Sequence, residues 1–312
     1  MEQTTDVQDV RVIHFGLGSL GAAIARTVAT REGLTSIAAI DPTPGRDGQD
    51  LGDVAGLRQA TGVVVEATSA GLRDVEADVV LFAPEGDLES ATTDLEILLE
   101  VGLNVVAVLP ELAYPPDDDD DDLAVSIDTL AREAEVTTLA LDPSDALLGT
   151  LPLSLTSVCA RVDRLVVRRR GATGLIGRLS LGDWAGALAN ALGWALDDLD
   201  EVEEELTGRP HGRHRIVGSV GGREVLVVEV LADGTGGSST LEVEVEGSPS
   251  LRMTVDGGSS AEEALATLAV NAIPAVLTSD PGLYTVPDLP PIHCWTSLGL
   301  MPADDEDYDD DV

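Results

Sequence analysis

The sequence contains no lysine, so its 18 basic residues are all arginine, and they stand against 57 acidic residues for a formal net charge of −39. This balance excludes nucleic acids and anionic membrane surfaces as partners, because their phosphates would be repelled rather than neutralised. Charge of one sign spread along a chain destabilises a compact fold unless salt screens it. The composition is typical of a halophilic cytoplasm, and an ordinary acidic protein is the alternative.

Cysteine and long apolar runs are also scarce. Cys159 and Cys294 are far apart and lack metal-ligand spacing, which excludes a disulfide framework and a zinc site. No apolar run reaches the ~18–20 residues of a transmembrane helix, and the N-terminal segment resembles no signal peptide. With 44% hydrophobic residues the chain can still bury a sizeable core. We therefore expect a cytoplasmic protein, with no membrane contact and no metal.

Short runs rich in valine and isoleucine alternate with helix-length segments in the first half of the chain. Helical patterns cover Ser19–Arg31, Asp87–Val101 and Leu123–Glu135. This alternation is typical of βαβ units and predicts an α/β Rossmann domain with a doubly wound parallel sheet.

The pattern changes after Leu153, where strands with alternating charge are separated by glycine-rich turns. Glu242, Glu244 and Glu246 recur with period two and are expected to form a solvated face of a mixed or antiparallel sheet. We predict a dinucleotide-binding domain at residues 1–145 and an α+β domain for substrate binding and oligomerisation at 146–300. The last segment of that second domain should return to the first, and residues 301–312 should form an acidic tail.

A glycine-rich loop follows the first predicted strand and precedes the first helix. In the motif Gly16-x-Gly18-x-x-Gly21, the glycines allow a tight turn, a close approach of a pyrophosphate and close contact between helix and strand. The N–H groups at the start of the helix can bind phosphates. The predicted cofactor loop consists of Gly16, Leu17, Gly18, Ser19, Leu20 and Gly21.

The second predicted strand ends at Asp41, twenty positions beyond the last glycine of the motif. An acid there accepts hydrogen bonds from an adenosine ribose and favours NAD, whereas Arg46 could accommodate the 2′-phosphate of NADP. The cofactor is therefore NAD or NADP, with NAD favoured. Ala83 and Pro84 end another strand where a nicotinamide ring would pass. Alternatively, the glycines only close a turn and the aspartate only caps a loop.

Several segments resemble, in order, those of the dihydrodipicolinate-reductase-like superfamily. They are "VIHFGLGSLG", "NVVAVLPELAYP", "TLPLSLTSVCARVDRLVV" and "VNAIPAVLTSDPGLYTVPDLP". More narrowly, the chain resembles the branch containing 2,4-diaminopentanoate dehydrogenase and related amine dehydrogenases, over nearly its whole length. The resemblance implies NAD(P)-dependent interconversion of a small amine with an imine or ketone, and a homo-oligomer, either a dimer or a tetramer.

In this family the acid of the "ELAYP" segment lies beside the nicotinamide, and Glu111 matches it. A carboxylate near the reacting carbon can hold an ammonium or iminium ion and exchange its proton. The resemblance makes Glu111 the catalytic candidate, although it could also be a loop acid bonded to nearby N–H groups. Tyr114, Asp142 and Asp145 are the candidate substrate residues.

The chain departs from the branch in the presumed substrate site. Asp142 replaces an asparagine, Ser144 replaces a glycine, and Gly149 stands where an acid is expected, for which Asp145 could substitute in another register. The segment after Arg170 is also shorter than expected. These changes motivate an alternative function, a non-catalytic dinucleotide-binding sensor or assembly protein with a degenerate substrate site.

Three charged segments are expected to have structural rather than functional roles. His211 and His214 are expected in an exposed loop, and Arg168–Arg170 are expected to pair with carboxylates across strands rather than to bind an anionic substrate. Asp117–Asp122 should form a solvated, salt-adapted loop before a helix, because consecutive aspartates point in different directions and cannot wrap around one ion.

Overall fold

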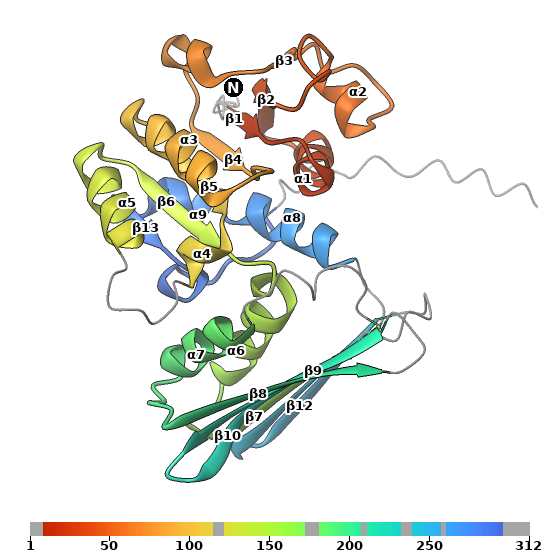
Figure 1. The fold of residues 1–312 in the computed structure, drawn as a ribbon, viewed down its shortest axis with the longest axis vertical. Helices are drawn as coiled ribbons and strands as arrows, with labels where there is room; N and C mark the ends of the chain where they lie inside the picture. The colour runs from red at the N-terminus through yellow and green to blue at the C-terminus, as the bar shows by residue number, and fades with distance from the viewer. Residues whose placement is uncertain are drawn as a thin grey trace, which may run out of the picture.

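The computed structural model describes residues 9–114, 122–171, 181–206, 211–231, 239–256 and 260–295. Within these residues the chain forms one sheet of seven strands and one of six. Figure 1 shows the seven-stranded sheet with its helices above and the six-stranded sheet below.

The seven-stranded sheet is parallel throughout. Its spatial order is β13 (Gly282–Tyr284), β6 (Thr137–Leu141), β5 (Asn104–Val108), β4 (Val79–Phe82), β1 (Val10–Phe15), β2 (Leu34–Ile40) and β3 (Val65–Glu66). Strands β4 and β6 are buried along their whole length, because helices cover both faces of the sheet. The doubly wound parallel sheet predicted from the sequence is confirmed.

Helices pack on the two faces of this sheet. They are α1 (Ser19–Ala29), α2 (Leu51–Ala55), α3 (Leu88–Glu100), α4 (Pro110–Ala113), α5 (Asp122–Glu133), α8 (Ala261–Asn271) and α9 (Ile273–Thr278), with a 3₁₀ turn η1 (Ser69–Asp74) and a second, η4 (Val286–Asp288). Side chains of α1 and α8 share a core with Val12, whereas those of α3 and α5 share a core with Ile13. Neighbouring residues of β1 thus face opposite helical layers.

Helices α8 and α9 and strand β13 come late in the chain and lie with the first sheet. By length and composition alone, the stretch Ala261–Thr278 could cross a membrane. It consists of two helices, and half of the stretch is buried within the protein, so it packs as a core element. The expected domain boundaries stay a prediction. The acidic tail lies outside the described residues, and so does the aspartate run up to residue 121.

The six-stranded sheet is mixed. Its spatial order is β12 (Leu251–Asp256), β11 (Thr240–Ser248), β7 (Arg161–Arg170), β10 (Arg223–Leu231), β9 (His211–Val220) and β8 (Asp198–Leu206). Only β7 and β10 pair in parallel, and the other neighbours are antiparallel. Apolar residues on one face pack with α7 (Leu181–Ala191), whose Trp184 is 1% exposed, and near α6 (Thr150–Thr156). The mixed sheet predicted for the second half is confirmed.

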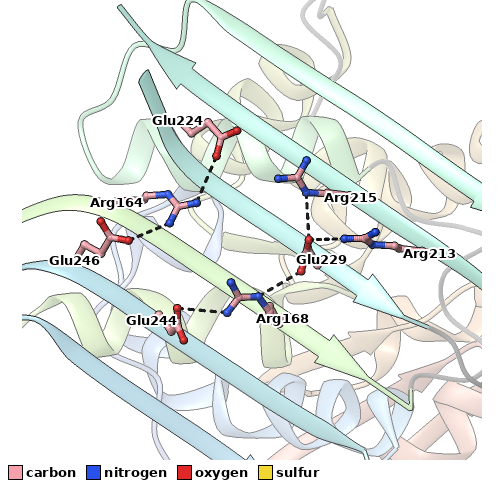
Figure 2. Close-up of polar contacts among 8 residues, drawn as sticks. All are labelled: Arg164, Arg168, Arg213, Arg215, Glu224, Glu229, Glu244 and Glu246. Atoms are coloured by element: carbon pink, nitrogen blue, oxygen red, sulfur yellow. Dashed lines mark hydrogen bonds and ion pairs between the residues drawn. The ribbon is translucent and has the colours of Figure 1, made fainter. Parts of the chain in front are cut away.

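The other face of this sheet carries a network of ion pairs, which Figure 2 shows. Arg168 contacts Glu229 and Glu244, each at 3.3 Å, and Glu229 also accepts from Arg213 at 2.8 Å and Arg215 at 3.1 Å. Cross-strand pairing is thus confirmed for Arg168. The expectation that the glutamates of β11 form only a solvated face is wrong for Glu244, because it lies opposite Arg252 on β12 and its carboxylate pairs with both Arg252 and Arg168.

Two residues near this network differ from the expectation. Arg169 lies on the opposite face of β7 from Arg168, is 7% exposed and has no carboxylate partner among the described residues. The loop expected around His211 and His214 is wrong, because both belong to β9. The ladder between β8 and β9 continues to Leu206 and His211, and it buries His214 with its Nε2 atom 2.5 Å from Glu201 Oε1.

The two phenylalanines of the chain contact each other directly beneath the glycine loop. Phe15 ends β1 and Phe82 ends β4, and their ring centroids are 4.8 Å apart. Phe82 is fully buried. The pair therefore fixes the spacing of the two strand ends from which the loop and Ala83 emerge.

Replacing Phe82 by alanine should lower the free energy of unfolding by about 3–5 kcal/mol, because a cavity would remain in the core. Phe82→Leu, which keeps most of the volume, should lose about 1 kcal/mol. Urea unfolding at constant molar salt measures both. Val158→Ala is the control, since Val158 is 68% exposed and should change stability by less than about 0.5 kcal/mol. Equal losses at positions 82 and 158 would contradict this packing.

Candidate active site

At two glycines of the loop, close contacts leave no room for a side chain. Gly16 has a φ of +78°, and a Cβ atom there would lie 2.1 Å from the carbonyl oxygen of Ala83. A Cβ atom on Gly21 would lie 1.9 Å from the carbonyl oxygen of Gly16. These two glycines therefore let β1, β4 and α1 approach closely, as the motif predicts.

The third glycine, Gly18, faces a cavity and precedes α1. Within the described part of the chain, α1 has no side-chain cap at its N-terminus. The first N–H groups of this helix are therefore available to an anion, and the helix dipole adds to the attraction. These features, together with the missing side chain at Gly18, fit the diphosphate of a dinucleotide.

The cavity has a volume of about 580 Å³, which lies in the range of sites for small ligands. It lies at the carboxyl ends of β1, β4 and β5, where ligands bind in doubly wound folds. Seven residues predicted from the sequence line it, namely Gly18, Ser19, Leu20, Gly21, Ala83, Pro84 and Glu111. The structure thus brings the cofactor loop and the catalytic candidate to one cavity.

Asp41 supports the glycine loop from outside the cavity. It is 1% exposed and accepts hydrogen bonds from the backbone N–H groups of Leu17 at 2.6 Å and Thr43 at 2.8 Å, and from Arg46 at 2.5 Å. Burial raises the pKa of Asp41, but hydrogen bonds from Thr43, Leu17 and Arg46 outweigh it and lower the pKa below its ordinary value. Its oxygens are thus occupied by protein donors in this structure.

Glu111 lies on α4, a single turn that starts with Pro110 directly after β5. The proline is well placed, because the first residue of a helix needs no N–H donor. The side chain of Glu111 is exposed and lines the cavity. Its carboxylate can therefore reach a ligand, whereas the next residues, Leu112 and Ala113, are buried in the core.

Three candidate substrate residues form a buried cluster behind Glu111. Asp145 is 1% exposed, accepts a hydrogen bond from the hydroxyl of Tyr114 and accepts a second from the N–H of Asp142 at 2.8 Å. Asp142 is 3% exposed and accepts from the N–H of Ser144 at 2.7 Å. None of these three candidates lines the large cavity. Their hydrogen bonds hold the loop that follows β6, and their role towards a substrate stays a prediction.

The cluster has perturbed protonation equilibria. Burial raises the pKa of Asp145 to about 7, against the opposing hydrogen bonds from Tyr114 and Asp142. Burial also raises the pKa of Asp142, and the negative charge of Glu111 adds to that shift. For Tyr114, burial and the nearby charge of Asp145 raise the pKa. Asp145 can therefore change its protonation near neutral pH.

The carboxylate of Asp145 lies beside Gly149, the position at which the sequence comparison expects an acid. Asp145–Gly149 forms a π-helical turn, and a Cβ atom on Gly149 would lie 3.4 Å from Asp145 Oδ1 and 3.4 Å from Trp184 Nε1. The carboxylate of Asp145 thus occupies the space beside position 149. That Asp145 supplies the expected acid from another register stays a prediction.

Sequence reasoning missed three carboxylates of the cavity wall. Glu85 and Asp87 follow β4, and Glu262 lies in the first turn of α8 and accepts from the hydroxyl of Ser19 at 3.2 Å. Glu85 could have been predicted to line the cavity, because it directly follows Pro84. Glu262 joins the site only through the packing of α8 against α1. Among the described residues, no group of three or more His, Cys, Asp or Glu side chains is arranged to hold a metal ion.

Known proteins share this architecture. Residues 213–299 match the family described as the 2,4-diaminopentanoate dehydrogenase C-terminal domain. A 2,4-diaminopentanoate dehydrogenase from Acetoanaerobium sticklandii is 23% identical, and the alignment covers 91% of this chain and 94% of the relative.

Two solved structures have the same fold. An amine dehydrogenase from Mycobacterium smegmatis superposes with a TM-score of 0.75 and 22% identity, over 92% of this chain and 98% of the other. A dihydrodipicolinate reductase from Paenisporosarcina sp. TG-14, with dipicolinate bound, superposes with a TM-score of 0.58 and 15% identity, over 90% and 99%.

The fold is that of a Rossmann-type protein with a second domain built on a mixed sheet, and it resembles the fold of the dihydrodipicolinate reductase. The resemblance to the branch of 2,4-diaminopentanoate dehydrogenase and amine dehydrogenases is confirmed by the match of residues 213–299 and by the relatives in both comparisons.

The raised pKa of Asp145 predicts a specific dependence of stability on pH. The folded state binds this proton up to about pH 7, whereas the unfolded carboxyl releases it near its ordinary value of 3.8. The stabilisation is therefore complete below the unfolded pKa and is lost as the pH rises towards the folded pKa.

The comparison of wild type with Asp145→Asn isolates this effect. The free energy of unfolding of wild type minus that of the variant should fall by a few kcal/mol as the pH rises, at ~1.4 kcal/mol per unit of pKa difference. Above about pH 7 it should become constant. Urea unfolding at fixed salt between about pH 5 and 8 measures it. A difference that is constant or rises with pH would show that Asp145 is ionised in the fold.

Proposed function

We propose that this protein is an NAD(P)-dependent oxidoreductase that moves hydride between a nicotinamide and the carbon of a small amine or imine, or of a ketone. The observation that carries the proposal is that the glycine loop and Glu111 line one cavity. The bound cofactor would supply the hydride donor or acceptor. The residues of the chain would bind and orient the substrate and exchange its proton.

The charge of the cavity favours an amine substrate. Every charged side chain that lines it within the described residues is a carboxylate, namely Glu85, Asp87, Glu111 and Glu262. A cationic ammonium or iminium group is stabilised in such a site, whereas an anionic substrate is repelled. The names of the relative from Acetoanaerobium sticklandii and of the amine dehydrogenase support the same class of substrate.

Glu111 is the residue that would meet the nitrogen of the substrate. Its exposed carboxylate can pair with the ammonium and accept a proton as the carbon is oxidised. Asp142 and Asp145 lie behind Glu111, where each carries either a negative charge or a proton. The hydroxyl of Tyr114 orients Asp145. These buried residues are positioning residues, because none of them lines the cavity.

The cofactor would be NAD or NADP, with NAD favoured. Asp41 repels a 2′-phosphate, and its bond to Arg46 offsets part of its charge. The guanidinium of Arg46 also lies 3.7 Å from Glu85, so it is shared between two carboxylates. A 2′-phosphate would have to compete with both for this arginine.

A homo-oligomer, either a dimer or a tetramer, and a location in the cytoplasm belong to the same proposal. The open face of the six-stranded sheet carries Val202, 47% exposed, beside the ion pairs of Figure 2, and a second copy could cover this face. We expect light scattering at molar salt to give the mass of a dimer or tetramer. A monomeric mass would contradict this part of the proposal.

Activity is tested with a panel of small amines at molar salt. We expect reduction of NAD or NADP with at least one amine, followed through the absorbance of the reduced nicotinamide. Glu111→Gln should lower kcat/KM by about 10²–10⁴-fold, because it removes the group that exchanges the proton. Glu100→Gln is the control, since Glu100 is exposed at the end of α3 and does not line the cavity.

The same experiment separates the enzyme from the non-catalytic alternative. If a dinucleotide binds, the whole panel is inert and Glu111→Gln changes no measured property, the catalytic role must be abandoned in favour of a sensor or assembly protein. If neither dinucleotide binds at molar salt, both functions are wrong.

A further inference from the structure

The carboxylate of Glu85 lies against the glycine loop where Gly18 leaves room. A Cβ atom added to Gly18 would lie only 2.0 Å from Glu85 Oε1 and 2.3 Å from its Cδ atom. The loop accommodates this carboxylate because residue 18 is a glycine. The same missing side chain is what lets the diphosphate of a dinucleotide approach the backbone. Glu85 and a diphosphate would therefore occupy the same place.

Arg46 connects Glu85 to Asp41 across the loop. Its Nη1 atom is 2.5 Å from Asp41 Oδ2 and 3.7 Å from Glu85 Oε2. Asp41 follows β2 and Glu85 comes shortly after β4, and these two strands flank β1 in the sheet. The row of three charges therefore passes over the loop that leaves β1. In this position the carboxylate of Glu85 forms an ion pair with Arg46.

The N-terminus of α1 explains why a carboxylate is stable at this place. Its N–H groups lack a side-chain acceptor, and the dipole of an eleven-residue helix favours negative charge there. A diphosphate bound to these N–H groups would lie beside the carboxylate of Glu85. Both cannot stay, because like charges at contact distance repel each other, most strongly where little water screens them.

We propose that Glu85 is a built-in competitor of the dinucleotide, an affinity-determining residue whose carboxylate occupies the diphosphate place until the cofactor displaces it. The inference rests on the proposed function, because it requires a dinucleotide ligand. The side chain of Glu85 has room to turn away, since it is 57% exposed, whereas that of Asp41 is only 2% exposed. Arg46 would then keep its shorter contact, the one to Asp41.

This competition makes the affinity for the cofactor depend on salt in an unusual direction. The displaced Glu85 and the neighbouring Asp87 and Glu262 repel the phosphates, and molar salt shortens the Debye length to about 3 Å. Wild-type affinity should therefore rise with salt. Most sites for phosphates behave oppositely, because they rely on basic residues.

The test compares Glu85→Gln with wild type in binding NADH and NADPH, followed by the fluorescence of the reduced nicotinamide without any substrate. We expect the variant to bind about three- to tenfold more tightly at the lowest salt at which both proteins stay folded, the size of one partly screened charge contact. The ratio should approach one at molar salt. Glu85→Asp, which keeps the charge on a shorter side chain, should have intermediate affinity.

Glu100→Gln removes one carboxylate outside the cavity and serves as the matched control, with wild-type affinity expected. Equal or weaker binding by Glu85→Gln at low salt would overturn the inference and leave the proposed function standing. Tightening of the same size in Glu100→Gln would also overturn it, because net charge alone would then explain the effect. Absence of dinucleotide binding in every form would remove the proposed function together with this inference.

Discussion

The contact of Gly16 with the backbone of Ala83 is the constraint on which the site depends. The end of β1 approaches the end of β4 so closely that no Cβ atom fits at position 16, and α1 approaches equally closely at Gly21. The buried pair of Phe15 and Phe82 holds the two strand ends from beneath. Because these contacts fix the loop, the N-terminus of α1, Pro84 and Glu111 all open onto one cavity.

Carboxylates of the six-stranded sheet and carboxylates of the cavity have different surroundings. On the six-stranded sheet, strands that carry glutamates alternate with strands that carry arginines, so each carboxylate of the network pairs with an arginine on a neighbouring strand. Around the cavity the described charged lining is acidic, and Arg46 pairs with Asp41 and with Glu85 of that lining. The site therefore suits a cationic substrate but opposes an anionic cofactor, and high salt relieves that conflict.

Local patterns predicted the elements of the first domain and the cofactor loop, because strand and helix periodicity and the glycine motif act over short distances. The pairing of residues far apart in the chain could not be predicted in the same way. The position of Glu262 depends on the packing of α8 against α1, and that of His214 on the length of the hairpin between β8 and β9. The place of Asp145 beside Gly149 depends on a π-helical turn, which has no sequence signature.

A crystal structure of the protein with NADH at molar salt would test the central claim most directly. The account predicts that the diphosphate lies on the N–H groups of Gly18 to Gly21, with Glu85 turned away, and that the nicotinamide carbon C4 faces the carboxylate of Glu111. A cofactor bound outside this cavity, or a nicotinamide directed away from Glu111, would contradict it.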